Sequence, residues 1–182
     1  MNKTGIIYGI NGPVIYLKGD SGFKISEMVY VGKDHLVGEV IGLKKGMTTI
    51  QVFEETTGLR PGETVIGTGD AISVLLGPGI IHNIFDGIQR PLEEIAKTSG
   101  KYISRGVSVD SLDTEKKWHT HITVKEGDVV GPGTIIAETQ ETASILHKSM
   151  VPPNITEGTV IKAAPDGDYT ILEPIVTIEL RD

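Results

Sequence analysis

The sequence predicts a mainly β protein, with a small closed β-barrel at the N-terminus, a short helical hinge and a second unit built as a β-sandwich. Short apolar runs with strand-like alternation recur over residues 4–66 and again from residue 118. The chain has 23 glycines and 9 prolines, which suits the many tight turns of small barrels. Between the two β regions, residues 76–95 instead have the apolar spacing of short helices.

The bulk composition excludes several classes of function. A net charge of −7 over 182 residues argues against a nucleic-acid partner, whose phosphates are bound by clustered Lys and Arg. The absence of cysteine rules out a disulfide framework and suits a reducing compartment. Residues 1–20 lack the apolar core of a signal peptide, and no run approaches the roughly 18 apolar residues of a membrane span. We therefore expect a cytoplasmic protein without direct membrane insertion.

The N-terminal barrel is predicted from a dense series of strands and turns. Asn11 and Gly12 supply turn chemistry between the first two strands. Gly38 and Gly42 interrupt the fourth strand pattern, as the bends of a barrel require. The expected strands are 6–10, 14–17, 26–31, 36–42, 47–53 and a short one beginning at 65–66.

The hinge, residues 71–111, is predicted to be partly helical. Residues 71–76 are expected to form a last apolar strand that leads into the Gly77-Pro78-Gly79 turn. A first short helix is predicted from one apolar face made by Ile80, Ile84, Phe85 and Ile88. Pro91 predicts a second helix over 91–97, because a proline in the first turn forfeits no hydrogen bond. Glu93 and Glu94 would favour its N-terminal dipole, and a weak strand is expected over 102–109.

The second β unit, residues 112–182, is predicted to be a flattened sandwich of short strands. Residues 118–124 alternate cleanly, and turns at 125–128 and 131–133 flank the Val129–Val130 pair. Residues 165–168, Pro-Asp-Gly-Asp, have the composition of a hairpin turn. This rhythm is similar to biotinyl and lipoyl carrier domains, which makes the unit barrel-sandwich-hybrid-like.

A carrier function would need a lysine at an exposed hairpin tip. The corresponding tip falls near residues 144–147, and Lys148 lies close to it. Its flanks are His147 and Ser149 rather than the methionines typical of carriers. A stand-alone carrier-like binding module therefore remains the alternative function, with Lys148 as its modification site.

No phosphate-binding loop is present in the 182 residues. The motif G-x-x-x-x-G-K-[ST] bares backbone N–H groups for phosphates and adds a lysine and a hydroxyl. The two Gly-Lys pairs, at Gly32 and Gly100, are followed by Asp34 and Tyr102 and have no glycine five residues before them. No G-x-S-x-G nucleophile elbow occurs either.

The histidines make an incomplete metal site. His119 and His121 would face the same side of a strand and could form half of a zinc site or the metal site of an enzyme. No other pair of ligands has diagnostic spacing, so no metal is predicted. His35, His82 and His147 are isolated, and His82 is expected to make a hinge or interface contact.

Paired acids do not predict catalysis here. The pairs are Glu54-Glu55, Glu93-Glu94 and Asp110 with Asp113. Adjacent carboxylates point apart and gather at turns, where solvated charge is the usual state, whereas glycosidases need two convergent carboxyl groups. We therefore predict no catalytic, cofactor-binding or metal-binding residue in this sequence.

Several long motifs resemble the catalytic A subunit of V/A-type rotary ATPases. The resemblance is carried by GIIYGINGPV (5–14), VGEV (37–40), QVFEETTGLRPG (51–62), LGPGIIHNIFDGIQRPLEEI (76–95), Trp118, 124–133 and QETASILHKSMVPP (140–153). It covers nearly the whole chain. The second β unit is the feature that favours the A subunit over the B subunit or F-type subunits.

This resemblance implies a division of labour among three segments. Residues 1–70 would be a barrel in an alternating hexameric ring with B subunits, and 71–111 the entry to the nucleotide-binding domain. Residues 112–182 would be the bulge domain that contacts peripheral-stalk subunits. The parent would use ATP and Mg to couple ATP hydrolysis or synthesis to proton or sodium transport, peripheral to the membrane. Its P-loop and catalytic glutamate would follow Asp182, so this portion alone is expected to be no enzyme.

Overall fold

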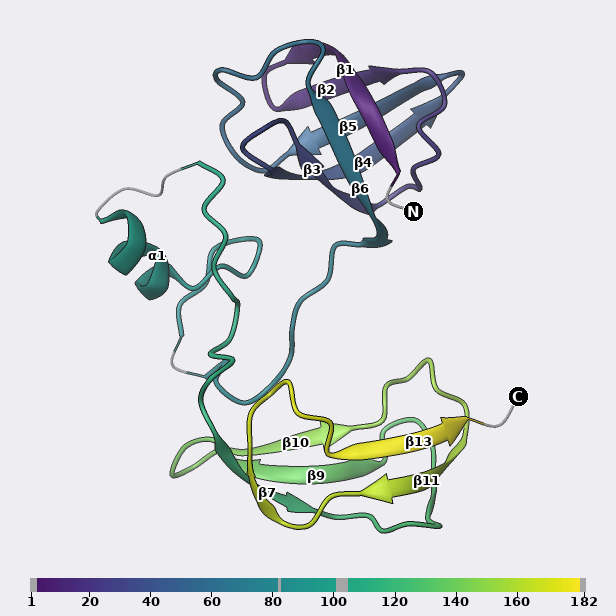
Figure 1. The fold of residues 1–182 in the computed structure, drawn as a ribbon, viewed down its shortest axis with the longest axis vertical. Coiled ribbons are helices and arrows are strands. Elements are labelled where there is room, and N and C mark those ends of the chain that lie inside the picture. Colours follow the sequence, from purple (N-terminus) through teal and green to yellow (C-terminus); the bar gives the residue numbers. More distant parts are fainter. Residues whose placement is uncertain (1–2, 82, 101–104, 181–182) are drawn as a thin grey trace. The chain divides into compact units, whose positions relative to one another are not determined.

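The computed structural model describes residues 3–81, 83–100 and 105–180 and is mainly β, as predicted (Figure 1). The chain divides into two compact units, each made of two segments. The first unit comprises Met1–Val74 and Ile95–Ser108, and the second comprises Leu75–Glu94 and Val109–Asp182.

The first unit is a closed antiparallel barrel. Six strands follow one another around it in the order β1-β2-β5-β4-β3-β6, and β6 pairs with β1 to close it. The closure leaves no free sheet edge. The strands are β1 (Thr4–Asn11), β2 (Val14–Lys18), β3 (Glu27–Val31), β4 (Leu36–Lys44), β5 (Met47–Val52) and β6 (Thr64–Ala71).

Alternation along these strands fills the barrel with aliphatic side chains. The interior positions are fully buried and include Ile7, Ile15, Leu17, Val29, Val31, Leu36, Val40, Ile50, Val52 and Val65. The bend predicted at Gly42 coincides with an irregularity in the β4–β5 pairing between Val40 and Gly42, whereas Gly38 pairs in regular register. Gly38 has the backbone of β5 against it, because a Cβ there would lie 2.8 Å from the Gln51 carbonyl oxygen.

One carboxylate is buried inside the barrel wall. Only 1 % of Glu27 is exposed, and it has the same strand parity as the buried Val29 and Val31. Its Oε2 accepts a hydrogen bond from the Lys24 N–H at 2.8 Å and its Oε1 accepts one from the Gly69 N–H at 3.0 Å. These two bonds offset the cost of removing the charge from water.

The hinge contains one helix among the described residues rather than two. The second predicted helix is present as α1 (Leu92–Ser99), which begins after Pro91. It ends at Gly100, whose φ of +74 is the left-handed conformation common after a helix C-terminus. The first predicted helix is wrong: residues 80, 81 and 83–88 are turns and irregular backbone.

The strand predicted over residues 71–76 is also wrong, and the described part of the one predicted over residues 102–109 is not a strand. Ala71 is the last residue of β6, and residues 72–76 form no strand. Residues 105–109 are irregular, and residues 102–104 of that expected strand lie outside the described residues. His82 lies outside the described residues as well.

The second unit consists of two antiparallel sheets. One has four strands in the order β10-β9-β7-β12, and the other has three in the order β13-β11-β8. Val130, Val151 and Val160 form the core, with Val124, Ile136, Ile155, Ala163, Val176 and Ile178 packed around it. The strands are β7 (Trp118–Ile122), β8 (Val129–Val130), β9 (Ile135–Gln140), β10 (Leu146–Met150), β11 (Gly158–Ala163), β12 (Gly167–Tyr169) and β13 (Val176–Leu180).

The Pro165–Asp168 segment does not close a hairpin. Residues 164–166 connect β11 to β12, but β11 pairs with β13 and β8, whereas β12 pairs with β7. The turn composition therefore marks the point where the chain passes from one sheet to the other.

Candidate functional site

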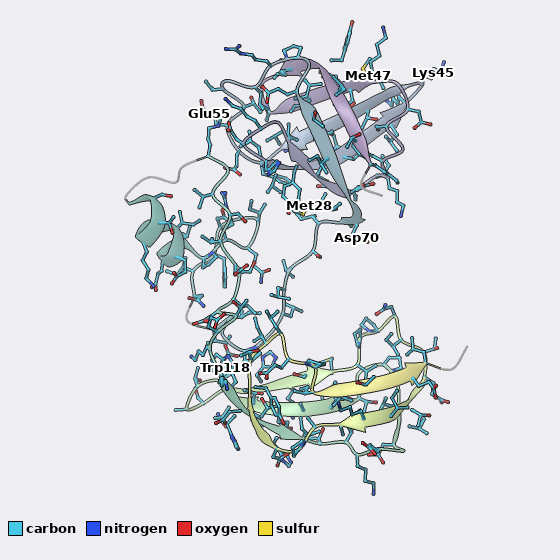
Figure 2. All side chains as sticks on the ribbon, in the orientation of Figure 1. Met28, Lys45, Met47, Glu55, Asp70 and Trp118 are labelled. Carbon is cyan, nitrogen blue, oxygen red and sulfur yellow. The ribbon has the colours of Figure 1, made fainter. Side chains whose placement is uncertain are left out.

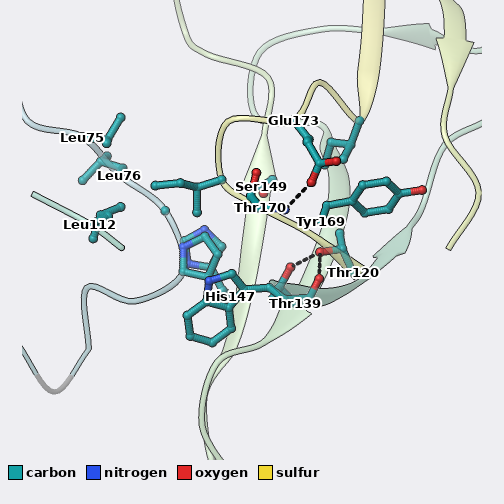
Figure 3. Close-up of a pocket in the computed structure, with 15 residues that line it drawn as sticks. Leu75, Leu76, Leu112, Thr120, Thr139, His147, Ser149, Tyr169, Thr170 and Glu173 are labelled. Atoms are coloured by element: carbon teal, nitrogen blue, oxygen red, sulfur yellow. Dashed lines mark hydrogen bonds between the residues drawn. The ribbon is translucent and has the colours of Figure 1, made fainter. Parts of the chain in front are cut away.

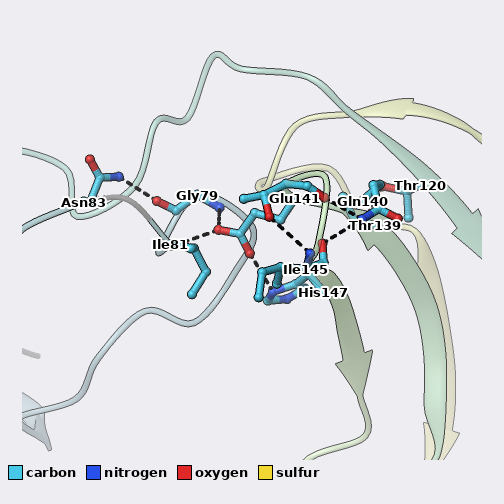
Figure 4. Close-up of polar contacts among 10 residues, drawn as sticks. Gly79, Ile81, Asn83, Thr120, Thr139, Gln140, Glu141, Ile145 and His147 are labelled. Atoms are coloured by element: carbon cyan, nitrogen blue, oxygen red, sulfur yellow. Dashed lines mark hydrogen bonds and ion pairs between the residues drawn. The ribbon is translucent and has the colours of Figure 1, made fainter.

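A buried carboxylate fixes the Gly-Pro-Gly turn to the second unit (Figure 4). Glu141 follows β9, and only 2 % of its side chain is exposed. Its Oε1 accepts hydrogen bonds from the N–H groups of Gly79 and Ile81, both at 2.8 Å, and its Oε2 lies 3.5 Å from Nδ1 of His147. We call Glu141, Gly79, Ile81 and His147 the Glu141 anchor.

The anchor holds the backbone of the Gly-Pro-Gly turn. Gly79 has a φ of +107, which an L-residue adopts only with strain. Asn83 donates from Nδ2 to the Gly79 carbonyl at 2.6 Å, so the turn is also closed from within. The N–H groups of Gly79 and Ile81 are thus bound by a side chain 62 and 60 residues later in the chain.

A second set of side-chain hydrogen bonds shapes residues 86–90. Asp86 Oδ1 accepts from the backbone N–H groups of Ile88 at 3.0 Å and Arg90 at 2.9 Å, and Asp86 Oδ2 accepts from Arg90 Nε at 2.8 Å. Burial raises the pKa of Asp86, but the bonds from Arg90 and Ile88 outweigh it and leave the pKa lowered. Gln89 joins the same segment to Leu75, donating to its carbonyl and accepting from its N–H, both at 2.6 Å.

A pocket of about 170 Å³ lies beside the anchor (Figure 3). Leu76 and Leu112 supply apolar surface, while polar atoms come from Thr120, Thr139, His147, Ser149 and Glu173. Thr120 and Thr139 share a hydrogen bond of 3.0 Å, and Glu173 Oε2 accepts from the Thr170 N–H at 2.6 Å. These bonds engage Thr120, Thr139 and Glu173, and His147 contacts Glu141.

The two strand histidines lie where the alternation predicted. His119 and His121 are exposed on one face of β7, on either side of the buried Thr120. Each is paired with an aspartate: His119 Nδ1 lies 2.8 Å from Asp168 Oδ1, and His121 Nδ1 lies 2.6 Å from Asp166 Oδ2.

These contacts shift two pKa values. The hydrogen bond to Asp166, and then its charge, raise the pKa of His121. The Ile122 N–H, and then His121, lower the pKa of Asp166. Among the described residues, no three His, Cys, Asp or Glu side chains are grouped so that they could hold a metal together.

The other singled-out residues are dispersed. Lys148 lies within β10, opposite Glu138 and 3.6 Å from its Oε1, whereas the hairpin tip is formed by residues 141–145. Glu54 Oε2 accepts from the Gly106 N–H at 3.0 Å, and Asp113 Oδ1 accepts from Glu115 and Lys116, so both have structural partners. His35 contacts the Tyr30 ring, with centroids 6.0 Å apart.

Sequence reasoning missed Glu27 and Glu141. Glu27 could have been found, because it continues the buried parity of Val29 and Val31 in the third predicted strand. Glu141 has no such signal, since its partners Gly79 and Ile81 lie 62 and 60 residues earlier.

Comparisons with protein families agree with this architecture. Residues 7–69 match the beta-barrel domain of the ATP synthase alpha/beta family, and residues 109–182 match the barrel-sandwich domain of the ATP synthase alpha/beta subunit. Among the described residues, no helix has the length and apolar character needed to cross a membrane.

Curated relatives match along nearly the whole chain. It is 49 % identical over 179 residues to the V-type ATP synthase alpha chain of Halothermothrix orenii, covering 98 % of this chain and 30 % of the relative. It is 51 % identical over 176 residues to V-type ATP synthase alpha chain 2 of Clostridium tetani, covering 97 % and 30 %. It is 50 % identical over 175 residues to the A subunit of the A-type ATP synthase of Methanopyrus kandleri, covering 96 % and 29 %.

The two matched domains show that the chain belongs to the ATP synthase alpha/beta family. Within this family it corresponds to the N-terminal portion of the A subunit of V/A-type ATP synthases, with about half of its residues identical to those relatives. The chain spans about 30 % of the length of the relatives described above.

Proposed function

We propose that this portion serves assembly rather than chemistry in an ion-translocating ATP synthase or ATPase. Its barrel would join B subunits in an alternating ring, and its barrel-sandwich domain would contact the peripheral stalk. The longer parent protein would bind ATP and Mg and would couple ATP hydrolysis or synthesis to proton or sodium transport. The division into residues 1–70, 71–111 and 112–182 belongs to this proposal.

The observation that carries the ring assignment is the placement of exposed apolar side chains on two opposite sides of the barrel. On the β6 side, Ile6, Tyr8 and Tyr30 are 55 %, 59 % and 36 % exposed. We call these residues, with the half-buried Ile66, the β6 surface. On the β5 side lie Ile41, Leu43 and Met47, the β5 surface, where Figure 2 shows Met47 and Lys45 at the β4–β5 hairpin.

The closed strand order makes these two surfaces face away from each other. Between β6 and β5 lie β1 and β2 in one direction and β3 and β4 in the other. A protein with one contact surface on each side can have a neighbour on each side, which is the requirement for a ring. Exposed apolar side chains that cluster in this way are typical of protein–protein contacts.

A hollow beside the β6 surface adds charged contacts. It has a volume of about 620 Å³ and is lined by Lys33, His35, Arg60, Glu63 and Ile66 among others. Glu63 accepts from the backbone N–H groups of Lys33 and Arg60, and both of these cationic residues are exposed. A polar rim around an apolar centre is the usual composition of such an interface.

Support for the stalk contact comes from the three-stranded sheet of the second unit. Val129, Ile161 and Leu180 are exposed by 56 %, 52 % and 52 % on β8, β11 and β13. Their exposure leaves this sheet with apolar surface for a further partner.

The ring proposal is tested by mixing the chain with the B subunit of the same organism. Light scattering after size-exclusion chromatography should detect a complex, and Tyr8→Glu and Ile41→Glu should each weaken it at one of the two surfaces. Lys24→Glu is the matched control, because Lys24 is exposed but lies in neither surface. If both apolar variants bind B as the unaltered chain does, the ring proposal fails.

The carrier alternative is disfavoured by the position of Lys148. A carrier lysine must reach into the active sites of other enzymes, whereas Lys148 is paired with Glu138 within a sheet. Intact mass after expression with biotin and lipoate ligases should show no adduct, and an adduct lost in Lys148→Ala would favour the carrier. Calorimetry with Mg-ATP should likewise show no tight binding, since the 182 residues contain no P-loop.

A further inference from the structure

The solvent face of β7 presents two imidazoles at one site. His119 and His121 have 77 % and 62 % of their side chains exposed. Residues two apart on a strand lie about 6.5–7 Å from each other along its axis. Two imidazole side chains on the same face can therefore converge on one ion.

The hydrogen bonds fix which nitrogen is available. A carboxylate only accepts hydrogen bonds, so Asp168 and Asp166 take the Nδ1–H of His119 and His121 at 2.8 and 2.6 Å. In the neutral form of each ring the lone pair is then on Nε2, and Nε2 of neither ring has a hydrogen-bond partner among the described residues. Histidines that ligate metals usually have a carboxylate or carbonyl behind the other nitrogen in this way, because it fixes the tautomer and the ring orientation.

The carboxylates are themselves held in place. Asp168 pairs directly with His119 in the β12–β7 register. Asp166 Oδ1 accepts from the Ile122 N–H at 2.8 Å while its Oδ2 is bound to His121. Asp168 is thus held within β12, and Asp166, in the turn before β12, is held by the Ile122 N–H.

The surroundings favour a cation. Glu138 lies opposite His121 on β9, so three carboxylates (Asp166, Asp168 and Glu138) border the two imidazoles. Lys148, which pairs with Glu138 at 3.6 Å, is the cation next to them. The local charge with neutral imidazoles is negative, in a chain whose net charge is −7.

We propose that His119 and His121 bind one divalent transition-metal ion through their Nε2 atoms, with Asp168 and Asp166 as positioning residues. Water completes the coordination, because the described residues supply no third ligand at this place. Imidazole ligands suit Cu²⁺, Ni²⁺ and Zn²⁺, and the expected order of affinity places Cu²⁺ first. Mg²⁺ and Ca²⁺, which prefer oxygen ligands, should not compete.

The test uses the full 182-residue chain without an affinity tag. Calorimetric titration with Cu²⁺ alone should show one site, and the Cu²⁺ electron paramagnetic resonance spectrum should report nitrogen ligands. His119→Gln and His121→Gln should each abolish that site. His35→Gln is the matched control, because His35 is exposed in the first unit and should leave Cu²⁺ binding unchanged.

The positioning residues give a second readout. Asp168→Asn should weaken Cu²⁺ binding about tenfold and change the copper spectrum, since outer-shell partners contribute about 10–100-fold to affinity. Its thermal unfolding should stay close to that of the unaltered chain, which separates orientation from folding. Binding that survives in both histidine variants, or that is lost equally in His35→Gln, would overturn the proposal.

Discussion

At the scale of single residues, Glu141 links the Gly-Pro-Gly turn to the end of β9. One oxygen accepts two backbone N–H groups, and the side chain is almost fully buried. Charged hydrogen bonds in such places contribute more to stability than neutral ones, and an unpaired donor left behind is costly. The Gly-Pro-Gly turn therefore depends on a residue far away in sequence.

We expect Glu141→Ala to lower the free energy of unfolding of the second unit by about 1–3 kcal/mol, because it leaves the N–H groups of Gly79 and Ile81 without an acceptor. Urea unfolding measures the loss, and hydrogen exchange at these two amides should become faster. Glu126→Ala, an exposed glutamate of the same unit, is the control and should change little. An unchanged exchange rate at Gly79 in Glu141→Ala would contradict the anchor.

The lowered pKa of Asp86 predicts that its contribution to folding stability depends on pH. Its pKa is lowered in the folded chain by hydrogen bonds from Arg90 and Ile88 that outweigh burial. A carboxyl with a lowered folded pKa contributes stability above its unfolded pKa, about 3.9, and this contribution is lost as the pH falls through the folded pKa.

Asp86→Asn should therefore destabilise the second unit at pH 6 and have a smaller effect at pH 3. Urea unfolding of both proteins at the two pH values measures the difference. Asp110→Asn serves as the control, because Asp110 makes none of the turn contacts of Asp86. An equal effect of Asp86→Asn at both pH values would rule out the charge as its cause.

At the scale of elements, the strand predictions succeeded and the hinge predictions largely failed, for different physical reasons. Alternation with period two records which side of a barrel wall is buried, so β1 to β5 could be located from apolar residues alone. Ile80, Ile84 and Ile88 have helical spacing, but Ile84 is 65 % exposed while Ile80 and Ile88 are half-buried, so the three do not share one buried face. Side-chain bonds from Glu141 and Asp86 determine that backbone, and periodicity does not report them.

The candidate sites show the same limit. The spacing of His119 and His121 was enough to predict that they share one face of a strand. Their aspartate partners, however, come from β12 and the turn before it, and the sequence did not indicate that β12 pairs with β7. Lys148 was placed near a hairpin tip by analogy, but it is the third residue of β10. Spacing within a strand is visible in sequence, and the identity of the neighbouring strand is not.

In β6, one glycine is required by packing rather than by its backbone angles. A Cβ on Gly67 would lie 2.4 Å from Glu27 Oε1 and 2.7 Å from a Phe23 ring carbon. We expect Gly67→Ala to destabilise the barrel by about 1–3 kcal/mol, as overpacking does. Gly42→Ala is the matched control, since its Cβ would meet Thr49 at 3.5 Å, an ordinary contact. Thermal unfolding measures both, and equal effects would exclude the steric explanation.

At the scale of the whole molecule, the two units have separate cores. The barrel interior includes Ile50, and the second unit is centred on Val130, Val151 and Val160. Separate cores can unfold as separate cooperative units.

We therefore expect calorimetry to resolve two transitions. Ile50→Ala should lower only the stability of the barrel, by about 2–5 kcal/mol, and Val151→Ala should lower only that of the second unit. Hydrogen exchange of the core amides assigns each transition to its unit. If either substitution shifted both transitions equally, the units would be energetically coupled.

The positions of the strands along the chain determine the order in which the two units can fold during translation. All six barrel strands lie within Thr4–Ala71, so the closing β1–β6 pair is complete once this stretch has left the ribosome. The sheets of the second unit need β13, more than 100 residues later, to pair with β11. N-terminal domains generally fold first during synthesis. The nascent barrel can thus be native before Glu141 has been synthesised to bind the Gly-Pro-Gly turn. During this interval the apolar residues around that turn are most accessible to chaperones.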